Sequence, residues 1–141
     1  MNIRDMEISD IPNVISLAKK ESGFNVSEDT EAFWSDVQLR SWVRSGDVLL
    51  VAEEGDQIVG FVLSALHKPT GKVTWENQLV SKDYRGRGVA ESLIEELEKR
   101  LKEKGATYLH FLVKEDNRAW KYYVRKSFRL GYKFFWFGKK L

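Results

Sequence analysis

The segment from Trp75 to Ala90 constrains the fold most strongly, because a strand pattern changes there into a helix pattern across a short turn. The turn contains Gly86 and Gly88, and glycine allows the backbone to turn tightly with its N–H groups pointing inward. The helix that follows contributes unpaired N–H donors and the positive end of its dipole. Residues 75–90 are therefore predicted to form a strand–turn–helix unit whose turn can bind an anion.

Two arginines define the kind of anion. Arg85 and Arg87 bracket the turn, and a guanidinium group can fork onto phosphate oxygens, so the expected guest is a phosphate or pyrophosphate. The pattern is not that of a dinucleotide-binding fold, because Glu91 stands where the third glycine would be, and no Gly-Lys-Ser/Thr follows. An ordinary solvated loop is the alternative interpretation of such a turn.

The rest of the chain predicts a single α/β domain over residues 1–141, with a mixed sheet and helices on both faces. Apolar residues recur every four positions from Val89 to Leu101, which makes this helix the clearest element. The predicted elements, in order, are a strand beginning at Ile3, a helix from residues 9–10 to Gly23, a helix capped by Asp29 or Thr30 and reaching Val43, strands at 47–53, 57–66 and 72–80, the helix from Val89 to Gly105, a strand at 108–113, a helix beginning at residues 116–117 and a strand at 132–139.

Composition excludes several functions. The chain has no cysteine and a formal net charge of only +2, which excludes thiol chemistry and gives no overall argument for a nucleic-acid partner. His67 and His110 lie far apart without an acidic cluster beside them, so no metal site is expected. We see no signal sequence and no membrane span, and expect a cytoplasmic protein.

The strand at 72–80 has a strongly polar face. Strict alternation puts Val73, Trp75, Asn77 and Leu79 on one face, and Lys72, Thr74, Glu76 and Gln78 on the other. A central strand covered on both sides would be apolar throughout, so the polar face is expected to border a cleft or water. Trp34 and Trp42 could line a substrate cleft or simply pack on the sheet.

Two motifs resemble those of a known family. Arg85-x-x-Gly88-x-Ala90, preceded by Val80 at the end of a strand, resembles the acetyl-coenzyme A signature of the GNAT family, the Gcn5-related N-acetyltransferases. The segment from Asn117 to Phe128 is similar to the family's Asn-x-x-Ala-x-x-Phe-Tyr-x-x-x-Gly-Phe. It departs from it in the gap from Asn117 to Ala119, which is one residue short, and in Ser127, which replaces the glycine. The predicted order of elements is also that of the GNAT fold.

The resemblance implies a set of site residues. The pantetheine arm of acetyl-CoA would bond to the backbone of Leu79 and Val80, and the residue equivalent to the family asparagine would be Asn117. The pyrophosphate would lie on the N–H groups of Arg85, Gly86, Arg87, Gly88, Val89 and Ala90. Tyr123 matches the catalytic tyrosine that protonates the departing thiolate, and Glu76 is the candidate base, acting through water. The alternative interpretation of Tyr123 is a buried core tyrosine, and that of Glu76 is a solvated carboxylate without a chemical role.

Three functions remain open on this basis. The first is an N-acetyltransferase that passes the acetyl group of acetyl-CoA to a primary amine, of a small molecule or of a protein or peptide, by direct attack in a ternary complex. The second is a non-catalytic acyl-CoA-binding sensor. The third is RNA or ribosome association through basic residues interleaved with aromatics after Lys114. The edge of the last predicted strand could also join a homodimer.

One group of acidic residues bears on the acceptor. Glu28, Asp29, Glu31 and Asp36 hint at a cationic amine, although acidic residues at the start of a helix also serve as caps.

Overall fold

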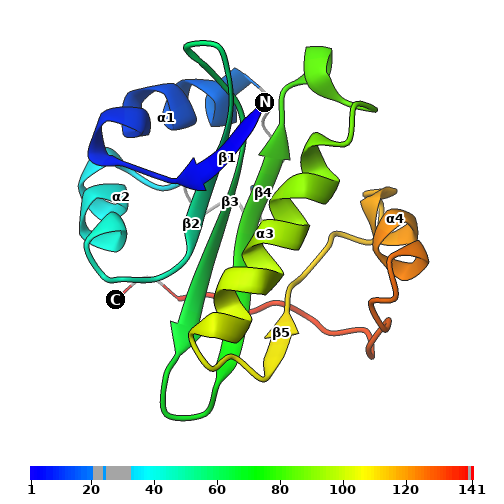
Figure 1. The fold of residues 1–141 in the computed structure, drawn as a ribbon. Helices are drawn as coiled ribbons and strands as arrows, with labels where there is room; N and C mark the ends of the chain where they lie inside the picture. Colours follow the sequence, from blue (N-terminus) through cyan, green and yellow to red (C-terminus); the bar gives the residue numbers. More distant parts are fainter. Residues whose placement is uncertain (21–23, 25–32, 140) are drawn as a thin grey trace. The chain divides into compact units, whose positions relative to one another are not determined.

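The computed structural model describes residues 1–20, 24, 33–139 and 141 (Figure 1). These residues form two compact units, Met1–His110 and Phe111–Leu141, which are described here one at a time. The predicted end of the first helix at Gly23 and the predicted caps Asp29 and Thr30 of the second lie outside the described residues, as do Glu28 and Glu31.

The first unit is built on a five-stranded sheet in the order β1-β2-β3-β4-β5. Its strands are β1 (Asn2–Asp5), β2 (Leu49–Glu54), β3 (Gln57–His67), β4 (Lys72–Val80) and β5 (Tyr108–His110). Neighbours from β1 to β4 are antiparallel, whereas β5 pairs parallel to β4. The parallel pairing confirms the predicted crossover from β4 through a helix to the next strand.

Helices cover both faces of this sheet. Helices α1 (Ile11–Lys20) and α2 (Asp36–Val43) lie on one face, and α3 (Val89–Glu103) lies on the other (Figure 1). Short 3-10 turns, η1 (Ile8–Asp10) and η2 (Lys82–Tyr84), precede α1 and follow β4. This arrangement confirms the predicted α/β class with helices on both faces.

Each face has its own apolar layer. On the α1 and α2 side, Phe61 and Leu63 of β3 pack with Val14 of α1 and Leu39 of α2, all four fully buried. On the α3 side the backbone of β3 approaches the helix closely at Gly60, where an added Cβ would lie 3.0 Å from the Leu79 carbonyl oxygen and 3.3 Å from the Leu93 side chain. Because Gly60 has no side chain, α3 can pack against the centre of the sheet.

The ends of the helices follow local chemistry. Ser35 and Gln38 form a reciprocal capping box at the start of α2, so this helix begins at Asp36. Gly105 has a φ of +82° after α3, and the N–H of Ala106 donates to the Leu101 carbonyl oxygen at 2.9 Å. This Schellman geometry confirms that Gly105 ends the helix.

The second unit contains α4 (Ala119–Arg125) and, within its described residues, no strand. The prediction of a strand at 132–139 is therefore wrong, and β5 ends at His110 instead of Val113. Tyr132, Phe135 and Phe137 are each about 90% exposed, so they bury no apolar face. Aromatic residues favour strands only where a neighbouring strand and a packing surface exist. The described residues of this unit therefore form no strand edge through which a second copy could pair.

Candidate functional site

The turn after β4 has the conformation that an anion site needs. Gly86 and Gly88 have φ values of +74° and +81°, and Gly88 is the N-cap residue of α3. No atom lies within 4 Å of a Cβ built at either position, so the left-handed backbone and not crowding requires glycine there. The first intrahelical bond runs from Ser92 N–H to the Gly88 carbonyl, which leaves the start of α3 directed at the turn.

Three hydrogen bonds hold strand, turn and helix together. Arg85 Nε donates to the carbonyl oxygen of Val80 at 3.0 Å, and Gln78 Nε2 donates to the carbonyl oxygen of Ala90 at 3.1 Å. The backbone N–H of Ser81 donates to the Val59 carbonyl oxygen at 2.9 Å. Arg85 thus braces the turn against the end of β4, a role that the sequence analysis did not anticipate for it.

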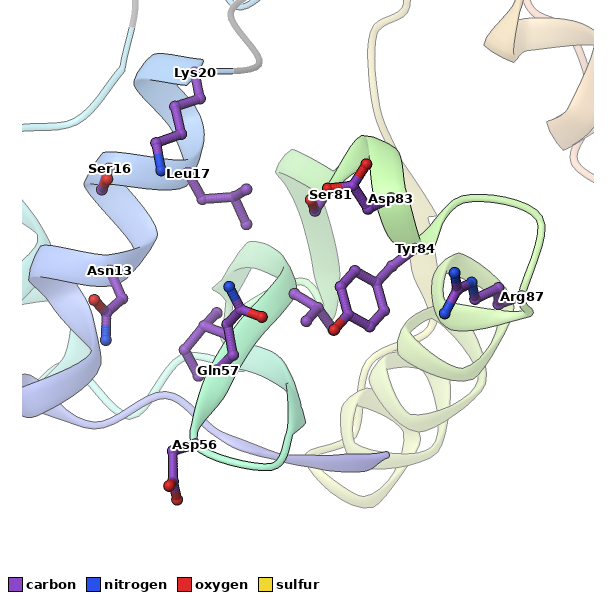
Figure 2. Close-up of a pocket in the computed structure, with 12 residues that line it drawn as sticks. Asn13, Ser16, Leu17, Lys20, Asp56, Gln57, Ser81, Asp83, Tyr84 and Arg87 are labelled. Carbon is purple, nitrogen blue, oxygen red and sulfur yellow. The ribbon is translucent and has the colours of Figure 1, made fainter.

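A pocket of about 510 Å³ adjoins the turn on the α1 side (Figure 2). The Tyr84 side chain reaches into it, and the Arg87 guanidinium carbon lies 5.1 Å from the centre of the Tyr84 ring. The remaining lining is mostly polar and carries both signs of charge, with Lys20 positive and Asp56 and Asp83 negative. Arg87, the second arginine of the turn, therefore lines this pocket and lies within the cation–π range of an aromatic ring.

Strand β4 carries a bulge at Glu76. Trp75 pairs with Ser64 and Asn77 pairs with Leu63, so Glu76 is the extra residue in the ladder with β3. Beyond the bulge the alternation is reversed: Asn77 and Leu79 share the α1 and α2 face, opposite to Trp75. The predicted grouping of Val73, Trp75, Asn77 and Leu79 on one face is wrong for this reason, because strict alternation assumes a ladder without an inserted residue.

The ladder between β4 and β5 is short. It runs from Lys72 opposite Tyr108 to Thr74 opposite His110, and β5 does not continue alongside residues 75–80. Leu79 and Val80, the residues predicted to bond an extended ligand, lie on that part of β4. β5 therefore covers the edge of β4 only from Lys72 to Thr74. Over residues 75–80 the same edge of β4 is not covered by β5.

Glu76 lies in a distinct electrostatic environment. Its side chain is exposed, yet desolvation raises the pKa of its carboxyl above the ordinary value, and the nearby His110 imidazole partly lowers it. His110 Nε2 lies 3.4 Å from Thr74 Oγ1. The sequence analysis gave His110 no role beyond excluding it as a metal ligand. Only the parallel register of β4 with β5 places it near Glu76.

Tyr123 belongs to the second unit, where it lies on α4. Its ring is half-buried, with centroids 4.6 Å from Phe111 and 5.9 Å from Phe128. Burial raises its pKa to about 12, with a smaller contribution from Tyr122. The phenol therefore keeps its proton throughout the neutral range.

Asn117, the other predicted site residue of this unit, bonds to the first residue of α4. Its Oδ1 accepts a hydrogen bond from the Ala119 N–H at 2.9 Å. Because Asn117 lies two positions before Ala119, its side-chain oxygen can accept this hydrogen bond within a local turn at the start of α4.

In the part of the chain that the structure describes, no group of three or more His, Cys, Asp or Glu side chains could hold a metal ion. None of the helices that the structure describes is long and apolar enough to cross a membrane.

A comparison with protein families assigns the chain to a class. The profile described as "Acetyltransferase (GNAT) family" matches residues 13–128. This range contains the glycine turn, the bulged strand and α4. The chain belongs to the GNAT acetyltransferase family.

Similar curated proteins are named acetyltransferases. An acetyltransferase of Pectobacterium atrosepticum is 37% identical over 89 residues, which are 61% of this chain and 62% of that protein. An acetyltransferase of Photorhabdus laumondii is 32% identical over 126 residues, or 89% of this chain and 84% of that protein. The match thus spans less than two thirds of the first relative.

A solved structure with the same fold is an aminoglycoside N-acetyltransferase, AAC(6')-Iy, in complex with CoA. It superimposes with a TM-score of 0.80 over 99% of this chain and all of that chain, at 16% sequence identity. At this identity the likeness shows the fold alone.

Proposed function

We propose that this protein is a cytoplasmic N-acetyltransferase that transfers the acetyl group of acetyl-CoA to a primary amine. The observation that carries the proposal is the turn between β4 and α3, in which two left-handed glycines lead directly into the start of a helix. Family membership supplies the class of reaction, and the site residues supply the roles below.

The turn suits a pyrophosphate. The N–H groups of residues 85–90 would hold it, since the start of α3 adds donors and a positive dipole end. Arg87 would add charge from the side of the pocket, and Arg85 would act both as a cation and as the brace on Val80. Asn117 could still contribute the amide nitrogen of its side chain, because Ala119 uses only the oxygen.

The end of β4 suits the pantetheine arm and the thioester. The arm would bond to the backbone of Leu79 and Val80 along the edge that β5 does not cover. A backbone N–H in the same part of β4 would stabilise the oxyanion that develops when the amine attacks the thioester carbonyl. The side chain of Leu79 packs in the core with Phe61, so only its backbone is offered to a ligand.

Glu76 and Tyr123 would handle the protons. An alkyl amine arrives protonated, and a carboxylate whose pKa is raised is a stronger base than an ordinary one. Tyr123 keeps its phenolic proton in the neutral range and could deliver it to the departing thiolate. The amine gains the acetyl group, loses its protons through Glu76 and water, and free CoA leaves as the thiol.

A calorimetric titration with acetyl-CoA at physiological salt tests the proposal first. The control is a short acyl thioester without the nucleotide, which cannot engage the turn. Binding in the micromolar range that requires the pyrophosphate is expected, followed by thiol release with members of an amine panel. Binding without thiol release would instead favour an acyl-CoA-binding sensor, and absence of binding would overturn both functions.

The amine panel is designed to identify the class of acceptor. It should contain small-molecule amines, including aminoglycosides, and peptide amines of both the α and side-chain types. Release of thiol with one class alone would define the acceptor class.

A further inference from the structure

The bulge at Glu76 raises the question of what holds its carboxyl in one direction. Since Glu76 has no partner residue in the register with β3, that ladder restrains it less than its neighbours. On one side Trp75 is buried, and on the other side Asn77 carries a polar side chain. The contacts of Asn77 therefore decide how firmly the bulge is held.

Asn77 makes a short hydrogen bond to a residue far away in sequence. The indole Nε1 of Trp34 donates to Asn77 Oδ1 at 2.6 Å, joining the segment before α2 to the centre of the sheet. Both side chains are half-buried, and Trp34 packs against the apolar cluster on the α1 and α2 face. If one partner of such a partly buried hydrogen bond is removed, the other is left unsatisfied, which costs free energy of folding.

Trp34 is itself held in place. Its ring meets Trp42 edge-on, with centroids 5.1 Å apart and an interplanar angle of 74°. Trp42 Nε1 donates to Asp47 Oδ2 at 3.0 Å, and Asp47 Oδ1 accepts from the backbone N–H of Leu66 in β3 at 3.0 Å. The series of contacts thus begins on β4 at the bulge and returns to the sheet on β3.

We infer that Asn77 and Trp34 are positioning residues, whose hydrogen bond fixes the β4 bulge and with it the direction of the Glu76 carboxyl. The inference rests on the proposed function, in which Glu76 accepts the proton of the amine. It adds residues that neither the motifs nor the family comparison points to. Because Asn77 adjoins Glu76 in the chain, a change in its side-chain contact is transmitted through a single peptide unit.

Four variants test the inference: Trp34→Phe, Asn77→Leu, the double variant, and Asn77→Asp. Trp34→Phe keeps an aromatic ring and removes the N–H, whereas Asn77→Leu keeps the size and removes the acceptor. Trp34→Phe and Asn77→Leu are each expected to lower kcat about tenfold, since a displaced catalytic group loses rate more than affinity. The dissociation constant of acetyl-CoA should stay within twofold of that of the wild type.

The double variant should lose little more than either single one, because both changes remove the same bond. Asn77→Asp retains an oxygen for the indole N–H and should keep most of the rate, which a merely structural role for residue 77 does not predict. Circular dichroism and melting temperature show which variants fold, and Trp34→Phe remains informative if Asn77→Leu does not.

The outcomes separate the inference from the proposed function. Acetyl transfer by the wild type together with unchanged kcat in Trp34→Phe, or with fully additive losses in the double variant, overturns the inference alone. A wild type that binds acetyl-CoA but acetylates no member of the amine panel overturns the proposed function, and the inference with it.

Discussion

Arg85 Nε donates a hydrogen bond to the carbonyl oxygen of Val80 at 3.0 Å, which joins the glycine turn to the end of β4. Arg87, two residues later, instead lies beside the Tyr84 ring at the pocket. The two arginines of the turn therefore differ in structure, although the sequence presents them as a pair.

This difference predicts different effects of removing them. Arg85→Ala should lower both the melting temperature and the affinity for acetyl-CoA, because it removes a brace and a charge. Arg87→Ala should lower the affinity, by about tenfold, with a smaller change in stability, since it removes a charge-assisted contact to phosphate and, within the protein, the contact with the Tyr84 ring. Calorimetry and thermal melting measure both effects. Equal loss of stability in the two variants would contradict the bracing role.

Gly88→Ala should disturb the turn. A non-glycine residue in the left-handed region costs about 1–2 kcal/mol, so both the stability of the protein and the acetyl-CoA site should suffer. Gly46 offers a matched control, because it has a φ of +82° with open space around it and lies in another turn. Gly46→Ala should lose similar stability in urea denaturation and keep its affinity for acetyl-CoA. Loss of affinity in both variants would assign the effect to general destabilisation.

Tyr123→Phe should lower turnover tenfold or more, with little change in the affinity for acetyl-CoA, because it removes the proposed proton donor. Since the pKa of Tyr123 is about 12, wild-type activity should show no loss from its ionisation below about pH 11. Tyr122→Phe is the control on the same helix and should retain most of the rate. An unaltered rate in Tyr123→Phe would remove the assignment.

The ionisation of Glu76 should determine how activity falls at acid pH. The base must be ionised, so kcat/KM should fall as the pH decreases through a pKa that lies above the ordinary value of about 4.3. His110→Asn should move this fall to higher pH, because the imidazole lowers the pKa of Glu76. A pH profile unchanged by His110→Asn would contradict the coupling.

Glu76→Gln should lower the rate and yet raise the melting temperature at pH 7. Desolvation disfavours the ionised carboxyl in the folded protein, so the wild type is less stable with Glu76 charged. The advantage of the variant should vanish as the pH falls through the folded-state pKa, where Glu76 becomes protonated. Thermal melting at several pH values measures this.

Ser127→Gly should stabilise the second unit. Ser127 has a φ of +68° at the end of α4, where the N–H of Phe128 donates to the Tyr123 carbonyl oxygen and that of Ser127 to the Val124 carbonyl oxygen, each at 3.1 Å. This Schellman geometry favours glycine, and the gain is expected to be up to about 1 kcal/mol. Ser127→Ala should bring no such gain in urea denaturation. A loss of stability with glycine would show that the left-handed conformation is not adopted.

The sequence by itself determined the features that depend on local chemistry. Periodicity identified α3, the glycines identified the turn, and their spacing with Arg85 identified the family. These signals are readable because a helix face, a tight turn and a phosphate-binding motif each involve residues close together in the chain.

Only the tertiary structure decided features that depend on pairing between distant segments. The bulge at Glu76 arises from the register of β4 on β3, and it reverses the faces that strict alternation assigns to Asn77 and Leu79. His110 comes near Glu76 through the parallel register of β5, and Trp34 reaches Asn77 across 43 positions. The predicted strand at 132–139 does not form in the structure, because a strand needs a partner that its own residues cannot supply.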